Sequence, residues 1–197
     1  LHRPRRARPH QCRIGAGRLA RRAGAASKSG GVLSMNKAKG RSLSDFGDLL
    51  PAEQRLLEAC SVGTPTFVDS QRPSERSIEN TVRAGVVAFF AMGGDEVAVV
   101  HHRGIDLVGA WIVDTLDLQR AEIRGNLHFR HCRFDTQPTM HGCFLNGNLS
   151  MCDCIVPGIS LDGAKIKGFV RFDDSKFIGS VRLVNAEIFG MLSLRGS

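Results

Sequence analysis

The C-terminal half of the chain repeats every eleven residues, and this period limits the folds available to it. A small residue stands two positions before a bulky apolar one, and this pair recurs eight times between Ala110 and Ile188. Successive small residues are separated by 11, 11, 11, 11, 10, 11 and 11 positions, with the short step just after Gly158. The small residues are Ala110, Ala121, Cys132, Cys143, Cys154, Ala164, Ser175 and Ala186. Antiparallel hairpins do not require a constant phase over eight units, so the pattern favours a solenoid over an ordinary antiparallel sheet.

Most units also carry a second apolar pair, such as Leu116 with Leu118 or Leu127 with Phe129. Side chains separated by one residue lie on the same side of an extended segment, so each unit supplies two short inward faces. Glycine follows the bulky residue by two positions in six units, and we expect the turn there because glycine tolerates positive φ. Two units then make a four-faced coil of about 22 residues. The predicted fold class is mainly β, a right-handed β-solenoid of about four coils and about 20 Å in length.

Two helices are expected before the repeat. Pro51 suits a first helical turn, residues 52–60 favour helix, and Gly63 is a plausible stop. A second helix is predicted over 77–92, with an apolar stripe that begins at Ile78, and a short strand over 97–100. The predicted organisation is therefore a tail over 1–44, a helical segment over 45–98 that could cap the solenoid, and solenoid repeats over 99–197.

The basic character of the chain belongs to the tail. The formal net charge is +8, but residues 1–44 hold 12 of the 27 Lys and Arg and none of the 19 acidic residues, which leaves a net charge of −4 for residues 45–197. The tail has no apolar period, and its composition predicts disorder. Because Met35 stands just before a normal-looking sequence, residues 1–34 are read either as translated upstream sequence or as a true basic arm or targeting segment.

Three segments carry a family resemblance: PAEQRLLEAC at 51–60, NTVRAGVVAFFAMGG at 80–94 and GIDLVGAWIVDTLDLQRAEIRGNLHFRHCRF at 104–134. Together they resemble bacterial pentapeptide-repeat-like β-solenoid proteins, often labelled membrane-associated oxidoreductase or hypothetical protein. The repeat alternates five and six residues rather than keeping a strict five. The resemblance covers about residues 45–197 and implies the fold, but it brings no catalytic motif onto this sequence. Members are usually longer, so we expect the chain to be truncated at its C-terminus.

Candidate sites each have a simpler interpretation. Gly15-x-Gly17-x-x-Ala20 matches a dinucleotide pattern, but a basic, proline-rich segment precedes it and the first acidic residue is Asp45. A cluster of His and Cys could bind zinc or an iron–sulfur cluster. The repeat register instead makes three of these cysteines small inward fillers. The cluster comprises His128, His131, Cys132, His141, Cys143, Cys152 and Cys154.

We therefore predict no catalytic, cofactor-binding or metal-binding residues and no cofactor. Trp111 should face outward and pack against the helical segment. The expected function is a non-enzymatic structural or protein-interaction module with a protein partner. The alternatives are the membrane-associated oxidoreductase that the resemblance implies, and nucleic-acid binding through the tail. The six cysteines without a secretory signal favour a cytoplasmic location, with peripheral membrane association as the variant. The longest apolar run is too short to span a bilayer.

The composition of residues 1–34 predicts that they contribute nothing to the fold. A chain that starts at Met35 should unfold at the same temperature as the full chain, as measured by thermal denaturation. A midpoint lowered by more than a few degrees, or about 1 kcal/mol for a domain of this size, would contradict the prediction.

Overall fold

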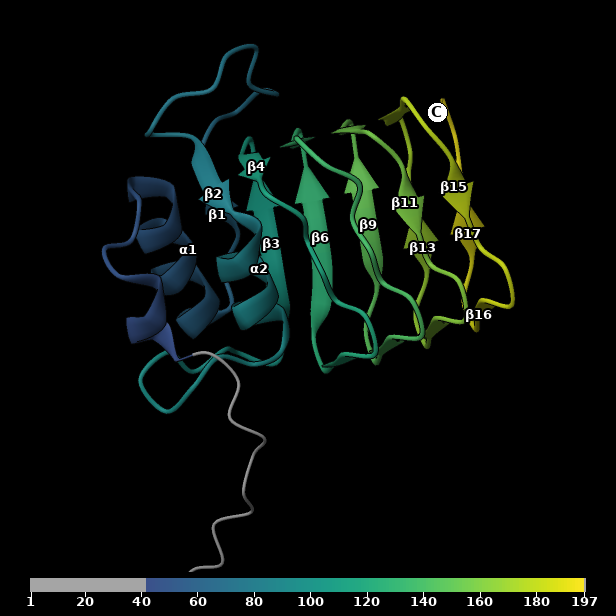
Figure 1. The fold of residues 1–197 in the computed structure, drawn as a ribbon, viewed down its shortest axis with the longest axis horizontal. Coiled ribbons are helices and arrows are strands. Elements are labelled where there is room, and N and C mark those ends of the chain that lie inside the picture. The colour runs from purple at the N-terminus through teal and green to yellow at the C-terminus, as the bar shows by residue number, and fades with distance from the viewer. Residues whose placement is uncertain (1–41, 197) are drawn as a thin grey trace, which may run out of the picture. The chain divides into compact units, whose positions relative to one another are not determined.

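A computed structural model of the chain describes residues 42–196. The chain divides into two compact units, and the second, Lys37–Ser197, contains every described residue. This unit is a parallel β-solenoid of about four coils that follows two helices, as the repeat predicted (Figure 1). The division into residues 1–44, 45–98 and 99–197 stays a prediction.

The helices lie at the N-terminal end of the solenoid. The helical elements are η1 (Leu43–Phe46), α1 (Pro51–Val62) and α2 (Ala84–Ala91). Helix α1 begins with proline at its first turn, and Gly63 ends it in the left-handed conformation. Both helices pack against the first strands of the solenoid, and their buried residues, such as Leu56 and Phe90, belong to the same core as the coils.

Each coil has four sides, which we call faces 1 to 4 in chain order. Face 1 contains β1 (Thr66–Phe67), β3 (Gly104–Val108), β6 (Asn126–Arg130), β9 (Leu149–Cys152), β13 (Val170–Arg171) and β17 (Leu192–Ser193). Face 2 contains β2 (Thr81–Arg83), β4 (Trp111–Val113), β7 (Arg133–Phe134), β10 (Ile155–Val156) and β14 (Lys176–Phe177). Face 3 contains β11 (Ile159–Ser160) and β15 (Val181–Arg182), and bridges through Asp117 and Thr139 extend it. Face 4 contains β5 (Glu122–Ile123), β8 (Phe144–Leu145), β12 (Lys165–Ile166) and β16 (Glu187–Ile188).

The coil length is 22 residues, two repeat units. On face 1, Leu127 pairs in parallel with Leu149, and Val170 pairs with Leu192. The one shorter step is 21 residues and falls between Val156 and Ser160, where the sequence placed its deletion. Gly158 absorbs the lost residue with φ of 154°, a value that side chains rarely allow. The register therefore confirms the predicted coil and the position of its one irregularity.

The interior is filled by the residues that the repeat placed inward. Ala164 and Ile166 on face 4 and Leu149 and Met151 on face 1 are fully buried. The second apolar pair also occurs where the sequence pattern was weaker. Ile105 and Leu107 supply it in the first coil, and Met140 is buried on face 3 of the second coil.

The sharpest corners lie one residue earlier than expected. In all eight units, the residue immediately before the small inward residue has positive φ. These corner residues are Gly109, Arg120, His131, Gly142, Asp153, Gly163, Asp174 and Asn185. Asn and Asp tolerate this conformation better than most side chains, which explains three of the non-glycine corners. The turn predicted at the glycines after the bulky residue is therefore wrong for most units.

Those later glycines serve close packing between coils. Gly125, Gly147, Gly168 and Gly190 stack at the corner between faces 4 and 1. A Cβ atom on Gly147 would lie 2.6 Å from the carbonyl oxygen of Gly125, so a side chain cannot enter. Beside this stack, the side-chain oxygen of Asn126 accepts hydrogen bonds from the backbone N–H (2.9 Å) and the amide of Asn148 (3.0 Å). Glycine is required here by proximity rather than by φ.

The second helix and the first strand both differ from prediction. Residues 81–83 form β2 instead of helix, because Val82 occupies an inward position paired with Ile112 of the first coil. Helix α2 is therefore only Ala84–Ala91, and Ile78, expected in its stripe, is exposed. Residues 97–100 form no strand, and Val99 makes only an isolated bridge with Gly94. The first strand after α2 is β3.

A buried ion pair ties α1 to β2. Glu53 is fully buried and accepts hydrogen bonds from Arg83 Nη2 at 2.6 Å, Arg83 Nε at 2.8 Å and the Leu50 backbone N–H at 2.9 Å. The Arg83 guanidinium also donates to the carbonyl oxygen of Phe46. A buried carboxylate needs this degree of pairing to offset its lost hydration. The pair therefore fixes the helices to the start of face 2.

Neighbouring residues on face 4 test the inward register. Ala164 is fully buried, whereas Lys165 points outward and forms an ion pair with Glu187 at 3.0 Å. Ala164→Leu should overpack the coil and lower the free energy of unfolding by about 1–3 kcal/mol. Lys165→Leu, the matched control, should change it by about 0.5 kcal/mol or less in denaturant titrations. If Lys165→Leu were the damaging change, the inward assignment would be wrong.

Candidate functional site

The coils disperse the His and Cys cluster over several faces. Cys132 and Cys154 lie inside face 2 and Cys143 inside face 4, all 1% exposed or less, as the repeat predicted. Cys152 and His128 belong to the outer side of face 1, whereas His131 and His141 lie at or near corners. Among residues 42–196, no group of three or more His, Cys, Asp or Glu is placed to hold a metal ion.

The inward cysteines are held as neutral thiols. Burial raises the pKa of Cys143 to about 11 and raises that of Cys154 well above its ordinary value. The Cys132 thiol donates to the carbonyl oxygen of Arg130 at a sulfur–oxygen distance of 3.2 Å. In the next coil, Ser175 takes the same inward position, where its hydroxyl accepts from the N–H of Cys154 and donates to the carbonyl oxygen of Met151. Protonated, buried thiols are poor nucleophiles and poor metal ligands, so these cysteines act as fillers.

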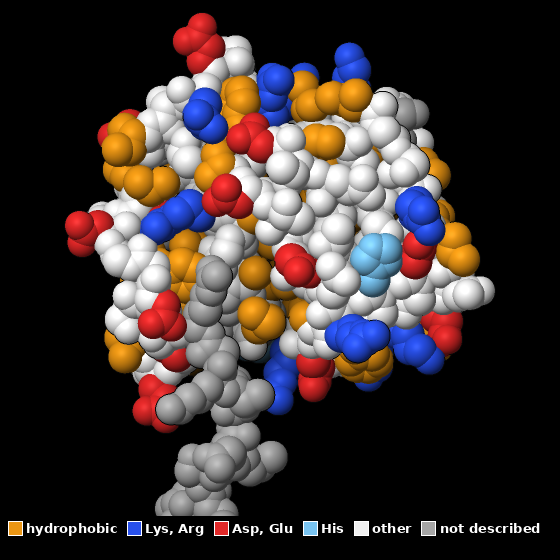
Figure 2. Space-filling model, in the orientation of Figure 1, with side chains coloured by type: hydrophobic (Ala, Val, Ile, Leu, Met, Phe, Trp, Pro, Cys, Tyr) orange, Lys and Arg blue, Asp and Glu red, His pale blue; other side chains and the backbone are white. Residues whose placement is uncertain are grey.

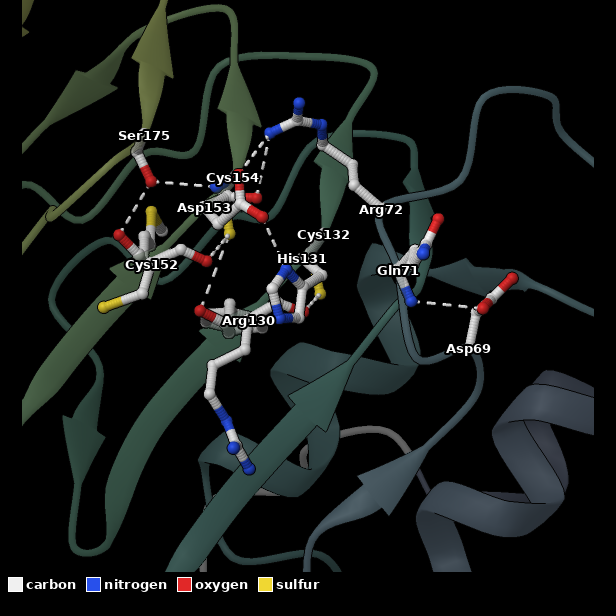
Figure 3. Close-up of polar contacts among 12 residues, drawn as sticks. Asp69, Gln71, Arg72, Arg130, His131, Cys132, Cys152, Asp153, Cys154 and Ser175 are labelled. Carbon is white, nitrogen blue, oxygen red and sulfur yellow. Dashed lines mark hydrogen bonds and ion pairs between the residues drawn. The ribbon is translucent and has the colours of Figure 1, made fainter. Parts of the chain in front are cut away.

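A polar cluster lies at the corner between faces 1 and 2, and Figure 3 shows it in close-up. One carboxylate oxygen of Asp153 accepts from Arg72 at 2.7 Å, and the other lies 2.6 Å from Nδ1 of His131. Arg72 comes from the loop after β1 and also donates to the backbone carbonyl of Asp153. Both carboxylate oxygens are thereby occupied. The cluster fastens the loop to the second and third coils.

The outer side of face 1 aligns three residues that the sequence keeps 22 positions apart. Asp106, His128 and Ser150 stack in register on β3, β6 and β9. Asp106, however, binds Arg130 through both oxygens, and the Ser150 hydroxyl pairs with Cys152. Burial, with repulsion from neighbouring arginines, lowers the pKa of His128, and its Nε2 is buried without a hydrogen-bond partner.

The row Asp106–His128–Ser150 therefore lacks the hydrogen bonds that connect a nucleophile, its base and an orienting acid. Sequence reasoning missed this row, although the 22-residue coil length would have revealed it.

Trp111 faces outward on face 2, as expected. Its indole N–H donates to Asp135 at 2.5 Å, and the Arg133 guanidinium lies 4.5 Å from its ring centroid. Arg76, from the segment before β2, forms an ion pair with the same carboxylate at 3.5 Å. The contacts given for the indole are with the second coil, so Trp111 ties the first two coils together.

Exposed apolar side chains gather at the C-terminal end. Between residues 104 and 177 no large apolar side chain is exposed, whereas four outward or corner residues of the following segment are. We call these four the apolar collar: Ile178, Val184, Phe189 and Met191. Ile178 and Phe189 are each 70% exposed. Figure 2 shows hydrophobic side chains reaching the surface along the edge where Figure 1 places the C-terminal strands.

The collar occupies positions that are polar two coils earlier. The strand register places Asp135, His141, Asn146 and Asn148 at the positions equivalent to the four collar residues. The change is therefore specific to the last coil rather than a property of the repeat. A contiguous exposed apolar region on a folded protein typically marks a contact surface.

The fold defines the chain as a parallel β-solenoid repeat protein. Comparison of the chain with protein-family models, curated proteins and solved structures finds no match. Within residues 42–196, neither helix is long and apolar enough to cross a bilayer. The dinucleotide-like pattern from Gly15 to Ala20 lies outside the described residues.

Cysteine reactivity tests the placement of the thiols. In a Cys12→Ser background, a thiol reagent should modify Cys152 in the native protein, because Cys152 is the one partly exposed cysteine among residues 42–196. Cys132, Cys143 and Cys154 should react only as fast as the protein unfolds, because they are buried and protonated. Peptide mass spectrometry over time measures each site. Modification of Cys143 at the rate of Cys152 would contradict the buried assignment.

Proposed function

We propose that this chain is a non-enzymatic structural or protein-interaction module. The observation that carries the proposal is the apolar collar, which places four exposed apolar side chains on the last coil of an otherwise polar solenoid surface. The parallel coils make a rigid support for such a surface because every coil is hydrogen-bonded to the next. Binding surfaces on repeat proteins rely on this kind of scaffold.

The chemistry of the polar side chains supports the same reading. Asp153 and Asp106 are held by arginines, and the inward thiols are buried. The hydrogen bond from Arg182 lowers the pKa of Asp162, which keeps that carboxylate charged and bound. These groups hold coils and loops together. We further propose that the chain belongs among the pentapeptide-repeat-like solenoids, supported by its four faces and its alternation of five and six residues.

A photoreactive side chain placed at position 189 tests the interaction surface. In the full chain, irradiation should link residue 189 covalently to a second polypeptide, because Phe189 lies in the collar. The same side chain at position 146 is the control, since Asn146 holds the equivalent position two coils earlier. The linked polypeptide is analysed by mass spectrometry and must also fail to bind a Phe189→Glu variant. Equal linkage at both positions would contradict the proposal.

The oxidoreductase alternative has its own measurement. The proposal predicts that the purified full chain shows no flavin absorption band and releases no nicotinamide on denaturation. A flavin that co-purifies in stoichiometric amount would overturn the non-enzymatic part of the proposal.

A further inference from the structure

We propose that the occupant of the apolar collar is a second copy of this chain, bound end to end about a two-fold axis. The inference rests on the proposed interaction function and identifies its partner. It begins with the collar itself, whose members lie at three of the four corners of the last coil. Val184 lies between faces 3 and 4, and Phe189 and Met191 lie between faces 4 and 1.

The collar requires a partner that reaches around the rim of the coil. Stacking of one coil on the next buries inward residues such as Leu145 and Ile166, but it leaves outward residues such as Lys165 more than half exposed. A further coil of the repeat would therefore cover the inside of the last coil and leave much of the collar in water. A folded surface that is as wide as the solenoid covers both.

The last coil also offers unpaired strand edges. Strands β14, β15, β16 and β17 each stand at the edge of their sheet, with a hydrogen-bonded neighbour on one side only. Edge strands of this kind favour pairing with another chain. A second copy presents the same four edges together with the same apolar collar, so the two surfaces are complementary in chemistry.

The opposite end of the solenoid excludes a head-to-tail arrangement. There, α1 packs against β1, β2 and β3, and α2 packs against β2 and β3. The end of one copy cannot stack on the helix-covered start of another in the way that coils stack on each other. Like ends must then meet, which gives a closed two-fold dimer rather than an open filament.

Charges on the last coil do not oppose this contact. Arg182 pairs with Asp162 at 2.7 Å, and Glu187 pairs with Lys165 at 3.0 Å. Both partners belong to the third coil, so each pair spans the boundary between coils. Two like ends therefore bring together apolar side chains and neutralised pairs rather than rows of equal charge.

Sedimentation equilibrium of the full chain over a concentration series tests the inference. The average mass should rise from the 21.4 kDa of one chain to twice that value and then stay constant. Phe189→Glu should weaken the dimer at least about tenfold, since a charge would be buried at the contact. Ile178→Lys, at a separate corner, should have the same effect. Asn146→Glu, at the position equivalent to Phe189 two coils earlier, should leave the dissociation constant unchanged.

Each outcome decides between the two proposals. The far-ultraviolet circular dichroism and thermal midpoint of each variant must match those of the original chain, and Ile178→Lys replaces Phe189→Glu if the latter fails to fold. A chain that stays monomeric, grows without limit or keeps its dimer in both variants overturns the second-copy inference. If a different protein is then linked to position 189, the interaction module stands without the dimer. If none is linked, both proposals fall.

Discussion

The structure depends on the backbone hydrogen bonds between each coil and the coil 21 or 22 residues further on. The N–H of Lys165 donates to the carbonyl oxygen of Cys143, and that of Glu187 donates to the carbonyl oxygen of Ala164. This register places like residues on top of like residues and builds one continuous core from short strands that could not bury their own apolar side chains. Corners, glycine stacks and ion pairs are all arranged around that register.

The stacking determines what the outer surface can do. Residues 22 positions apart become neighbours, so Asp106 and Arg130 or Asp162 and Arg182 form pairs that reinforce the coil boundary. The same rule aligns Asp106, His128 and Ser150, yet each carries contacts that serve the scaffold instead. The collar departs from this pattern because its side chains are apolar, outward and confined to one coil, which is why the interaction proposal rests on it.

Much of the fold could be predicted because inward packing leaves a direct mark on composition. A small inward residue such as Ala164 beside a bulky Ile166 reflects the narrow interior, and the deletion at Gly158 was visible as one short step. The corners were misplaced because glycine has two uses, and Gly147 is needed for close approach rather than for positive φ. Residues 81–83 escaped prediction because their strand depends on pairing with β4, which local propensity does not contain. The collar could be recognised only once coil positions were known.

Scalar couplings through hydrogen bonds test the central claim, the parallel register, most directly. In a uniformly ¹⁵N,¹³C-labelled sample, the account predicts coupling from the amide nitrogen of Lys165 to the carbonyl carbon of Cys143, and from Ile155 to Cys132. An antiparallel sheet of consecutive strands would instead couple residues of neighbouring repeat units, whose sequence separations change from pair to pair along the ladder. Couplings at constant separations of 22 or 23 between successive coils support the solenoid, and couplings between adjacent eleven-residue units would contradict it.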